Sequence, residues 1–339
     1  MEKTFRRRVT LSVLAMLIII SIDGCTDREI PVCRREVTLL GRPMSIAVYG
    51  KRSEHIVREL TRTALLLGER IDGSGEDSQL ALLSSMSSNR GVQVEDELFV
   101  LIEKSLNLAR ISSGMYDPTA APLYRIWRRF WPSSRSPSRD EVYRVLEKVR
   151  YEEVSLRPRT REVFLGKPGM ELNPREIVDG YLLDCCTEFL LDYDFISAVL
   201  RYGDVSRYII RQGENVIREE AHPVILDADL EPVVKLSDCR NKAVALIYPQ
   251  KRLIIDPRNG YPVRTPLWCA AVVGPEAVTA DALALILAVG GLDRGMQLIN
   301  DMPFFEAVCV TMEQEIYLSR DGQGYVKSYV PGYTPVDAE

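Results

Sequence analysis

One octapeptide, Leu253-Ile254-Ile255-Asp256-Pro257-Arg258-Asn259-Gly260, joins a buried strand end to a tight turn. Its three leading apolar residues predict the end of a buried strand, and Asp256-Pro257 fixes the direction in which the chain leaves it. Asn259 and Gly260 are residue types that tolerate a positive φ in a tight turn. Such a rigid corner is typical of places where a scaffold holds a ligand, although the pattern alone also fits an ordinary β-turn.

The composition is that of an ordinary globular protein, with 339 residues of which 46% are hydrophobic and 27% are charged. One large domain or two closely packed halves fit this length. The formal net charge of −5 argues against a nucleic-acid partner, because no stripe of lysine and arginine outweighs the acidic residues. The only histidines are His55 and His222, so no histidine cluster can form a zinc site. Any metal is therefore expected to bind through oxygen, which favours magnesium or calcium.

Residues 1–24 have the pattern of a lipoprotein signal peptide. Arginines at 6–8 precede an apolar run at 9–22, and Ile22-Asp23-Gly24-Cys25 is similar to a lipobox. Cleavage there makes Cys25 the lipidated N-terminus, with palmitate among its acyl chains. We therefore expect an exported lipoprotein that is anchored in the inner or outer membrane and faces the periplasm. An uncleaved signal anchor is the alternative, although the apolar run is slightly short for a transmembrane span.

The mature chain keeps six further cysteines, and none of them forms a Cys-x-x-Cys motif. Most lie in apolar runs, so we expect buried free thiols, while oxidation of a pair after export stays open. The cysteines are Cys33, Cys185, Cys186, Cys239, Cys269 and Cys309.

The remaining pattern predicts both helices and strands after a linker at 25–34. Helical spacing of apolar residues predicts helices at 54–71 and 95–113, and two strands are expected within 36–49 around a Gly-Arg-Pro turn. The tail at 329–339 is polar and is expected to be loose. Further strands are expected at 154–156, 162–165, 197–205, 208–210, 224–226, 232–236, 243–248, 270–274 and 307–318, and further helices at 140–149, 275–291 and 292–300.

Residues 171–191 predict a turn that enters a helix. The free N–H groups and the positive dipole end of that helix make its start the best anion site in the chain by position. Asp179 sits in its first turn, where its negative charge opposes a bound phosphate.

The helix at 275–291 is apolar on all sides except at Asp281, which predicts a buried helix. A buried carboxylate must be paired or bound to a metal, or else its pKa rises. Asp281 is therefore the sharpest candidate for a functional residue, and a local bond to backbone amides near the helix start is the structural alternative.

Taken in order, the motifs resemble those of the FAD:protein FMN transferases, the ApbE-like flavin transferases formerly labelled thiamine-biosynthesis lipoproteins. The resemblance runs over residues 35–320, and its two most specific motifs together are Gly-x-Tyr-Asp-Pro-Thr at 114–119 and Ile-Ile-Asp-Pro-Arg-x-Gly at 254–260. The supporting motifs are Gly-x-Pro-Met-Ser at 41–45, Asp77-Ser78-Gln79-Leu80, Pro122-Leu123, Ile177-Val178-Asp179-Gly180-Tyr181 with Asp184, Tyr202-Gly203-Asp204 and Ala280-Asp281-Ala282-Leu283-Ala284.

The resemblance implies an α+β fold, with mixed helices packed on antiparallel sheets in a single flavin-transferase-like domain at 35–328. It implies a transferase that takes FAD as substrate, uses magnesium to cleave the pyrophosphate, and passes FMN to a Ser or Thr hydroxyl of an exported redox protein. It assigns the metal to Asp281, beside which Asp179 is a second candidate ligand of this chain, and leaves the catalytic residue unknown. The cofactor-binding residues that it implies are Met44, Asp117, Pro118, Thr119, Asp179, Gly180 and Asp256.

Three positions depart from the family pattern, in which a histidine, a lysine and a threonine stand where this chain has Leu253, Asp179 and Leu285. Loss of a general base typically costs about 10²–10⁴ in rate. Two alternatives to an active transferase follow. One is a catalytically lapsed lipoprotein that binds flavin or is purely structural. In the other, FAD binding is lost as well.

The second alternative depends on residues 42, 175 and 176, where Arg42, Arg175 and Glu176 stand in place of smaller or different family residues. Against loss of the transfer reaction, Asp179 can itself bind magnesium beside Asp281, which turns a repulsion into a pair of ligands. We expect Asp281 to share a concave site with Asp256, with residues 117–119 and with the turn at Asp179.

Overall fold

The computed structural model describes residues 30–73, 75, 78–85, 90–130, 135–211, 222–237 and 239–336. The predicted signal peptide at 1–24, the lipidation site Cys25, Asp77 of the Asp-Ser-Gln-Leu motif and the last residues of the tail, 337–339, lie outside these ranges.

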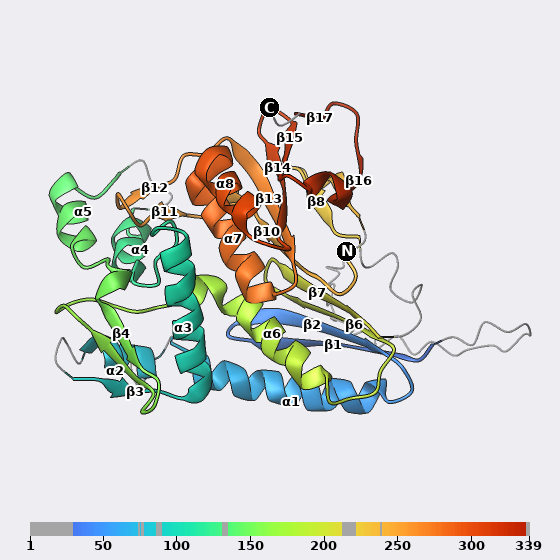
Figure 1. Ribbon diagram of the computed structural model, residues 1–339, viewed down its shortest axis with the longest axis horizontal. Helices are drawn as coiled ribbons and strands as arrows, with labels where there is room; N and C mark the ends of the chain where they lie inside the picture. The colour runs from blue at the N-terminus through green and yellow to red at the C-terminus, as the bar shows by residue number, and fades with distance from the viewer. Residues whose placement is uncertain are drawn as a thin grey trace, which may run out of the picture.

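A nine-stranded sheet runs through the molecule and carries most of its core (Figure 1). Neighbouring strands are antiparallel except for the last pair, so the α+β expectation is confirmed. In spatial order the strands are β1 (Val32–Leu39), β2 (Arg42–Tyr49), β6 (Ser197–Tyr202), β7 (Val205–Ile210), β10 (Ala243–Ile247), β13 (Leu267–Gly274), β14 (Glu306–Thr311), β15 (Glu315–Leu318) and β17 (Thr334–Pro335).

Helices cover one face of this sheet (Figure 1). The long helices are amphipathic or wholly apolar, and their buried residues pack on inward-facing residues of the central strands. They are α1 (Ser53–Ile71), α3 (Asp96–Ile111), α6 (Val178–Leu190) and α7 (Ala277–Gly290), and one π-helical turn at Gly291–Gly295 joins α7 to α8 (Met296–Asp301).

A three-stranded sheet covers the opposite face, where it forms a second apolar cluster with the central strands. Strand β6 is therefore buried on both sides: Leu200 packs toward the helices, whereas Val199 packs toward the small sheet. This explains why residues 198–200 are apolar without alternation in the sequence. The strands of the small sheet are β16 (Val326–Tyr329), β9 (Pro232–Leu236) and β8 (Val224–Leu226).

The smaller elements gather beyond the helical layer. A sheet of β3 (Val92–Gln93), β5 (Glu162–Leu165) and β4 (Val154–Arg157) lies near α2 (Gln79–Ser85), and α4 (Ala121–Arg128) packs with α5 (Arg139–Leu146). The 3-10 turn at Arg175–Ile177 leads directly into α6.

The predicted corner forms as a short hairpin, β11 (Ile255–Asp256) paired with β12 (Tyr261–Pro262). Gly260 has φ +80°, and a Cβ there would lie 2.8 Å from a side-chain carbon of Val142, so the turn needs glycine. The carbonyl of Gly260 accepts a hydrogen bond of 2.7 Å from Trp127 Nε1 in α4. The corner thus holds α4 in place beside it.

Two boundaries differ from expectation. Strand β1 begins at Val32, inside the predicted linker, because residues 32–39 pair in full register with β2. The tail is not loose up to residue 336, since Thr334–Pro335 pairs with Glu315 and Ile316 of β15. The single strand expected at 307–318 is a hairpin of β14 and β15.

The six described cysteines form no disulfide with one another; four of them are buried as expected, whereas Cys33 and Cys185 are half-buried. One helical stretch in the described ranges, Ala277–Asp301, is long and apolar enough to cross a membrane, but 56% of its apolar window is buried inside the protein. Since α7 packs on α6, β10 and β13, it is a core helix.

Candidate active site

The site begins where α6 crosses α7. A Cβ on Gly180 would lie 2.3 Å from the carbonyl oxygen of Ala277, so only glycine lets the two helices approach this closely. At the crossing, the Gly180 N–H donates to Asp281 Oδ2 at 3.1 Å. Asp281 and the turn at Asp179 are therefore neighbours, which confirms that part of the sequence prediction.

The start of α7 is fixed from the same helix, because Asp184 of α6 accepts hydrogen bonds of 2.9 Å from the N–H groups of Ala277 and Val278. A carboxylate here satisfies free amides and favours the positive end of the helix dipole. Asp184 thus has a positioning role: it sets the start of the helix that carries Asp281.

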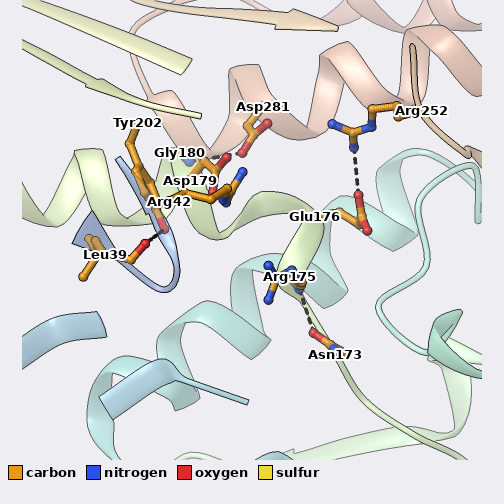
Figure 2. Close-up of polar contacts among 10 residues, drawn as sticks. All are labelled: Leu39, Arg42, Asn173, Arg175, Glu176, Asp179, Gly180, Tyr202, Arg252 and Asp281. Atoms are coloured by element: carbon orange, nitrogen blue, oxygen red, sulfur yellow. Dashed lines mark hydrogen bonds and ion pairs between the residues drawn. The ribbon is translucent and has the colours of Figure 1, made fainter. Parts of the chain in front are cut away.

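Arg42 is the partner of Asp179. The β1–β2 turn, with positive φ at Leu40 and Gly41, delivers Arg42 to α6, where its Nη2 donates to Asp179 Oδ1 (Figure 2). The Arg42 guanidinium carbon lies 5.0 Å from the ring centroid of Tyr202. This stacking favours the charged guanidinium beside the carboxylate.

Gly203 makes room for this pair at the β6–β7 turn. It has φ +56°, and a Cβ there would lie 2.1 Å from Asp179 Oδ2 and 3.0 Å from Arg42 Nη1. Tyr202 donates from its hydroxyl to the Leu39 carbonyl at 2.7 Å, which fixes the ring against the strand below. The Gly203 turn and the Tyr202 ring therefore hold the Arg42–Asp179 pair in a fixed position.

Burial, followed by repulsion from Asp179, raises the pKa of Asp281 well above its usual range. The Asp281 carboxyl is surrounded by protein atoms, but the residue as a whole is only partly buried. Burial and the neighbouring Asp179 carboxylate thus both disfavour the ionised form of Asp281.

A second ion pair, between Arg252 and Glu176, lies on the other side of the site. Arg252 Nη2 donates to Glu176 Oε2 at 2.8 Å, and the backbone N–H of Arg175 donates to Asn173 Oδ1 at 3.1 Å (Figure 2). At the anion site predicted at the start of α6, one backbone N–H is already occupied, because Gly180 donates its N–H to Asp281.

The two ion pairs and Asp281 line a cavity of about 400 Å³, which has the size of a small-ligand pocket. Leu253 and Leu285 also line it, so both departures from the family pattern face the site. Four arginines and four acidic residues contribute to the lining: Arg42, Arg128, Arg175 and Arg252, with Glu176, Asp179, Asp204 and Asp281.

A second cavity of about 840 Å³ adjoins the first. Its lining includes Asp117, Ala120 and Ala121 of the small-residue run, together with residues of α2 and α4. The two cavities share four lining residues, which makes them two chambers of one cleft: Tyr124, Arg128, Arg175 and Glu176.

Asp117, Pro118 and Thr119 form a self-bonded loop at the larger chamber. Asp117 Oδ1 accepts from the Thr119 N–H at 2.8 Å and from its hydroxyl at 2.6 Å, and Oδ2 accepts from the Tyr151 N–H at 3.2 Å. The carbonyl of Pro118 accepts from the Asn173 N–H at 2.8 Å, which ties this loop to the entrance of α6. Of these three residues only Asp117 lines the cleft.

Met44 and Asp256 line neither chamber. Met44 is fully buried opposite Tyr202 in the β2–β6 pair, where the inward side of the strand places it in the core. The Asp256 carboxylate is used by its own turn, since it accepts hydrogen bonds from Arg258 and Asn259. The expectation of one concave site therefore holds for Asp281 with the Asp179 turn, extends to Asp117 in the adjoining chamber, and is wrong for Asp256.

Sequence reasoning missed the roles of Arg42, Arg252 and Asp204. The sequence pattern presents Arg42 only as an obstacle to FAD, whereas in the folded chain Arg42 neutralises Asp179. Arg252 carried no motif, although it directly precedes the octapeptide at 253–260. Asp204 was visible within Tyr202-Gly203-Asp204, but only the folded chain brings it to the cleft.

Comparison with known proteins gives one consistent result. The sequence model of the ApbE family matches residues 40–309. An FAD:protein FMN transferase of Treponema pallidum (strain Nichols) is 25% identical over 333 residues, covering 89% of this chain and 91% of the relative. One from Klebsiella pneumoniae (strain 342) is 22% identical, covering 88% and 95%.

Solved structures show the same fold. The flavin transferase ApbE from Vibrio cholerae superimposes with a TM-score of 0.75 at 18% identity, covering 87% of this chain and 99% of that one. The ApbE protein from Thermotoga maritima gives a TM-score of 0.74 at 21% identity, covering 88% and 100%. With a family match over 40–309, this chain belongs to the ApbE family.

Proposed function

We propose that the cleft binds FAD and that the chain transfers FMN from FAD to a Ser or Thr hydroxyl of a redox protein. The observation that carries the proposal is the four-arginine lining of the smaller chamber, which opens into a larger chamber of about 840 Å³. A guanidinium-lined chamber suits a pyrophosphate, and the larger chamber has room for one of the two nucleotide ends. The names of the relatives from Treponema pallidum and Klebsiella pneumoniae support the same substrate.

In this reaction the acceptor hydroxyl oxygen forms a bond to the phosphorus of the FMN half. The bond from that phosphorus to the bridging oxygen breaks, and AMP leaves with the electron pair. Phosphoryl transfer of this kind depends mainly on positioning and charge neutralisation, both of which arginine side chains provide.

Asp204 is our candidate to accept the proton of the attacking hydroxyl. Glu176 and Asp179 are ion-paired, and Asp281 accepts from Gly180, whereas the Asp204 carboxylate makes no hydrogen bond or ion pair with another described residue. Asp204→Asn is expected to lower transfer by about 10²-fold or more while changing FAD affinity less than about twofold. Equal losses in both would reject this role.

The chamber offers too few oxygen ligands for the magnesium ion that the resemblance implies. Magnesium requires six oxygen ligands in near-octahedral geometry and commonly uses one or two protein carboxylates with water and phosphate. Asp179 is already bonded to Arg42, one Asp281 oxygen is bonded to Gly180, and Leu285 offers no oxygen one turn beyond Asp281. No cluster of three or more His, Cys, Asp or Glu residues suited to a metal occurs in the described ranges. These residues do not fit a resident magnesium ion.

A second candidate function is flavin binding without transfer. It is favoured by Leu253 and Leu285, which present only carbon to the chamber where the resemblance implies a histidine and a threonine. If this candidate holds, the Leu253→His and Leu285→Thr double variant is expected to gain a transfer rate that the wild type lacks.

Export and anchoring belong to the same proposal. The arginines at 6–8, the apolar run at 9–22 and the Gly24-Cys25 pair support cleavage before Cys25 and its lipidation. The acceptor is accordingly proposed to be an exported redox protein.

The deciding experiment combines two measurements on the purified full chain. Quenching of flavin fluorescence reports FAD binding, and mass spectrometry of a family-type acceptor protein reports covalently attached FMN. Binding with transfer supports the first candidate, and binding without transfer supports the second. Absence of FAD binding rejects both and leaves a structural role for the cleft.

A further inference from the structure

We propose that Arg42, held by Asp179, supplies the positive charge for the pyrophosphate, so that this chain binds FAD without a divalent cation. The inference rests on the proposed function, because it concerns how the same cleft holds the same ligand. It departs from the magnesium dependence that the resemblance implies.

The geometry of Arg42 carries the inference. Its guanidinium is fixed by the Asp179 carboxylate and the Tyr202 ring, and Gly203 leaves the space that the pair occupies. The side chain nevertheless keeps 39% of its surface exposed and lines the smaller chamber. A guanidinium has five N–H donors, so the bond to Asp179 leaves others available for phosphate oxygens.

Two further cations face the chamber without an acidic partner. Neither Arg128 nor Arg175 forms an ion pair with any residue in the described part of the chain. The Arg128 guanidinium carbon lies 5.8 Å from the ring centroid of Tyr124, which leaves its N–H groups free to turn toward a ligand. Together with Arg42, these side chains place three guanidinium groups around the position proposed for two phosphates.

Two of the acidic residues that line the chamber are already paired with arginines. The carboxylates of Asp179 and Glu176 are each neutralised by an arginine, Arg42 and Arg252 respectively. A cation that took Asp179 as a ligand would either share the carboxylate with Arg42, which holds Oδ1, or displace Arg42 from its position beside Tyr202 and Gly203. The folded chain thus already supplies, through Arg42, the charge that a divalent ion would bring to this position.

The test is an FAD titration of the full chain, followed by quenching of flavin fluorescence, in EDTA and again in magnesium chloride. Wild-type affinity is expected to differ by less than about twofold between the two buffers. Arg42→Ala is expected to weaken binding in EDTA by about tenfold or more, the size of one lost charge-assisted hydrogen bond. Because this variant frees Asp179, magnesium is expected to restore part of its affinity.

Two further variants separate charge from folding. Arg42→Lys keeps a cation and is expected to bind better than Arg42→Ala, while Arg62→Ala, on the exposed side of α1, is the matched control and is expected to bind as wild type does. Thermal unfolding of each variant identifies any loss caused by misfolding.

Each outcome decides a different point. A wild-type affinity that falls tenfold in EDTA overturns this inference and leaves the proposed function standing. The same holds if Arg42→Ala and Arg42→Lys, both folded, bind as tightly as wild type in EDTA. Failure of the wild type to bind FAD in either buffer overturns the proposed function and the inference together.

Discussion

Removing the Asp179 carboxylate would leave the Arg42 guanidinium half-buried without an opposite charge. A hydrogen bond to a charged group contributes about 1.5–3 kcal/mol to stability. The Asp179 side chain is only 12% exposed, but that of Arg42 is 39% exposed, so solvent screening lowers the expected value. We therefore expect a coupling free energy of about 1–2 kcal/mol between the two side chains.

A double-mutant cycle measures this coupling. Urea unfolding of wild type, Arg42→Met, Asp179→Ala and the double variant, followed by tryptophan fluorescence, gives four free energies of unfolding. The control cycle uses Arg161 and Asp96, an ion pair whose side chains are 40% and 71% exposed, where we expect about 0.5 kcal/mol or less. A coupling for Arg42 and Asp179 no larger than the control would refute the reasoning that their pair is a structural unit.

Three further outcomes follow from single positions. Gly180→Ala drives a Cβ to within 2.3 Å of the Ala277 carbonyl oxygen and is expected to cost about 1–3 kcal/mol in thermal unfolding, whereas Gly324→Ala, which meets no atom within 4 Å, is expected to be nearly neutral. The raised pKa of Asp281 means that its contribution to stability is complete below the unfolded pKa of about 3.9 and is lost as the pH rises through the folded pKa. Asp281→Asn in EDTA should therefore gain stability relative to wild type as the pH rises above the unfolded pKa of about 3.9, and a difference that does not change with pH would contradict the raised pKa. Cys25→Ala is expected to move the chain from the membrane fraction to the soluble fraction, and unchanged membrane association would reject lipidation as the anchor.

Much of the fold could be predicted because its signals are local. The apolar helix around Asp281, the turn at residues 256–260 and the strand pair within residues 36–49 each follow from periodicity or from turn residues within one short segment. The proximity of Asp281 to the Asp179 turn could be expected from the resemblance together with the need to satisfy a buried carboxylate.

The sequence could not reveal which side chains far apart in the chain form hydrogen bonds and ion pairs with one another. Arg42 and Asp179 are 137 residues apart, and Asp184 caps a helix that starts 93 residues later. No periodicity signals such contacts, because they depend on which strand and helix become neighbours. The sequence likewise identified the turn at Asp256 but not that the turn uses the whole carboxylate.

The fixed position of Arg42 also changes how the departure at residue 179 should be understood. Considered alone, Asp179 places a negative charge where the resemblance implies a lysine, which opposes a phosphate. In the folded chain Arg42 offsets that charge, and Gly203 provides the space, so a cation still faces the chamber, from strand β2 instead of helix α6. Asp179→Lys alone would then set two cations side by side in a site with little room, and it is expected to weaken FAD binding rather than improve it. Only when Arg42→Ala accompanies it does the lysine replace the lost charge, so the effects of the two substitutions must be strongly non-additive.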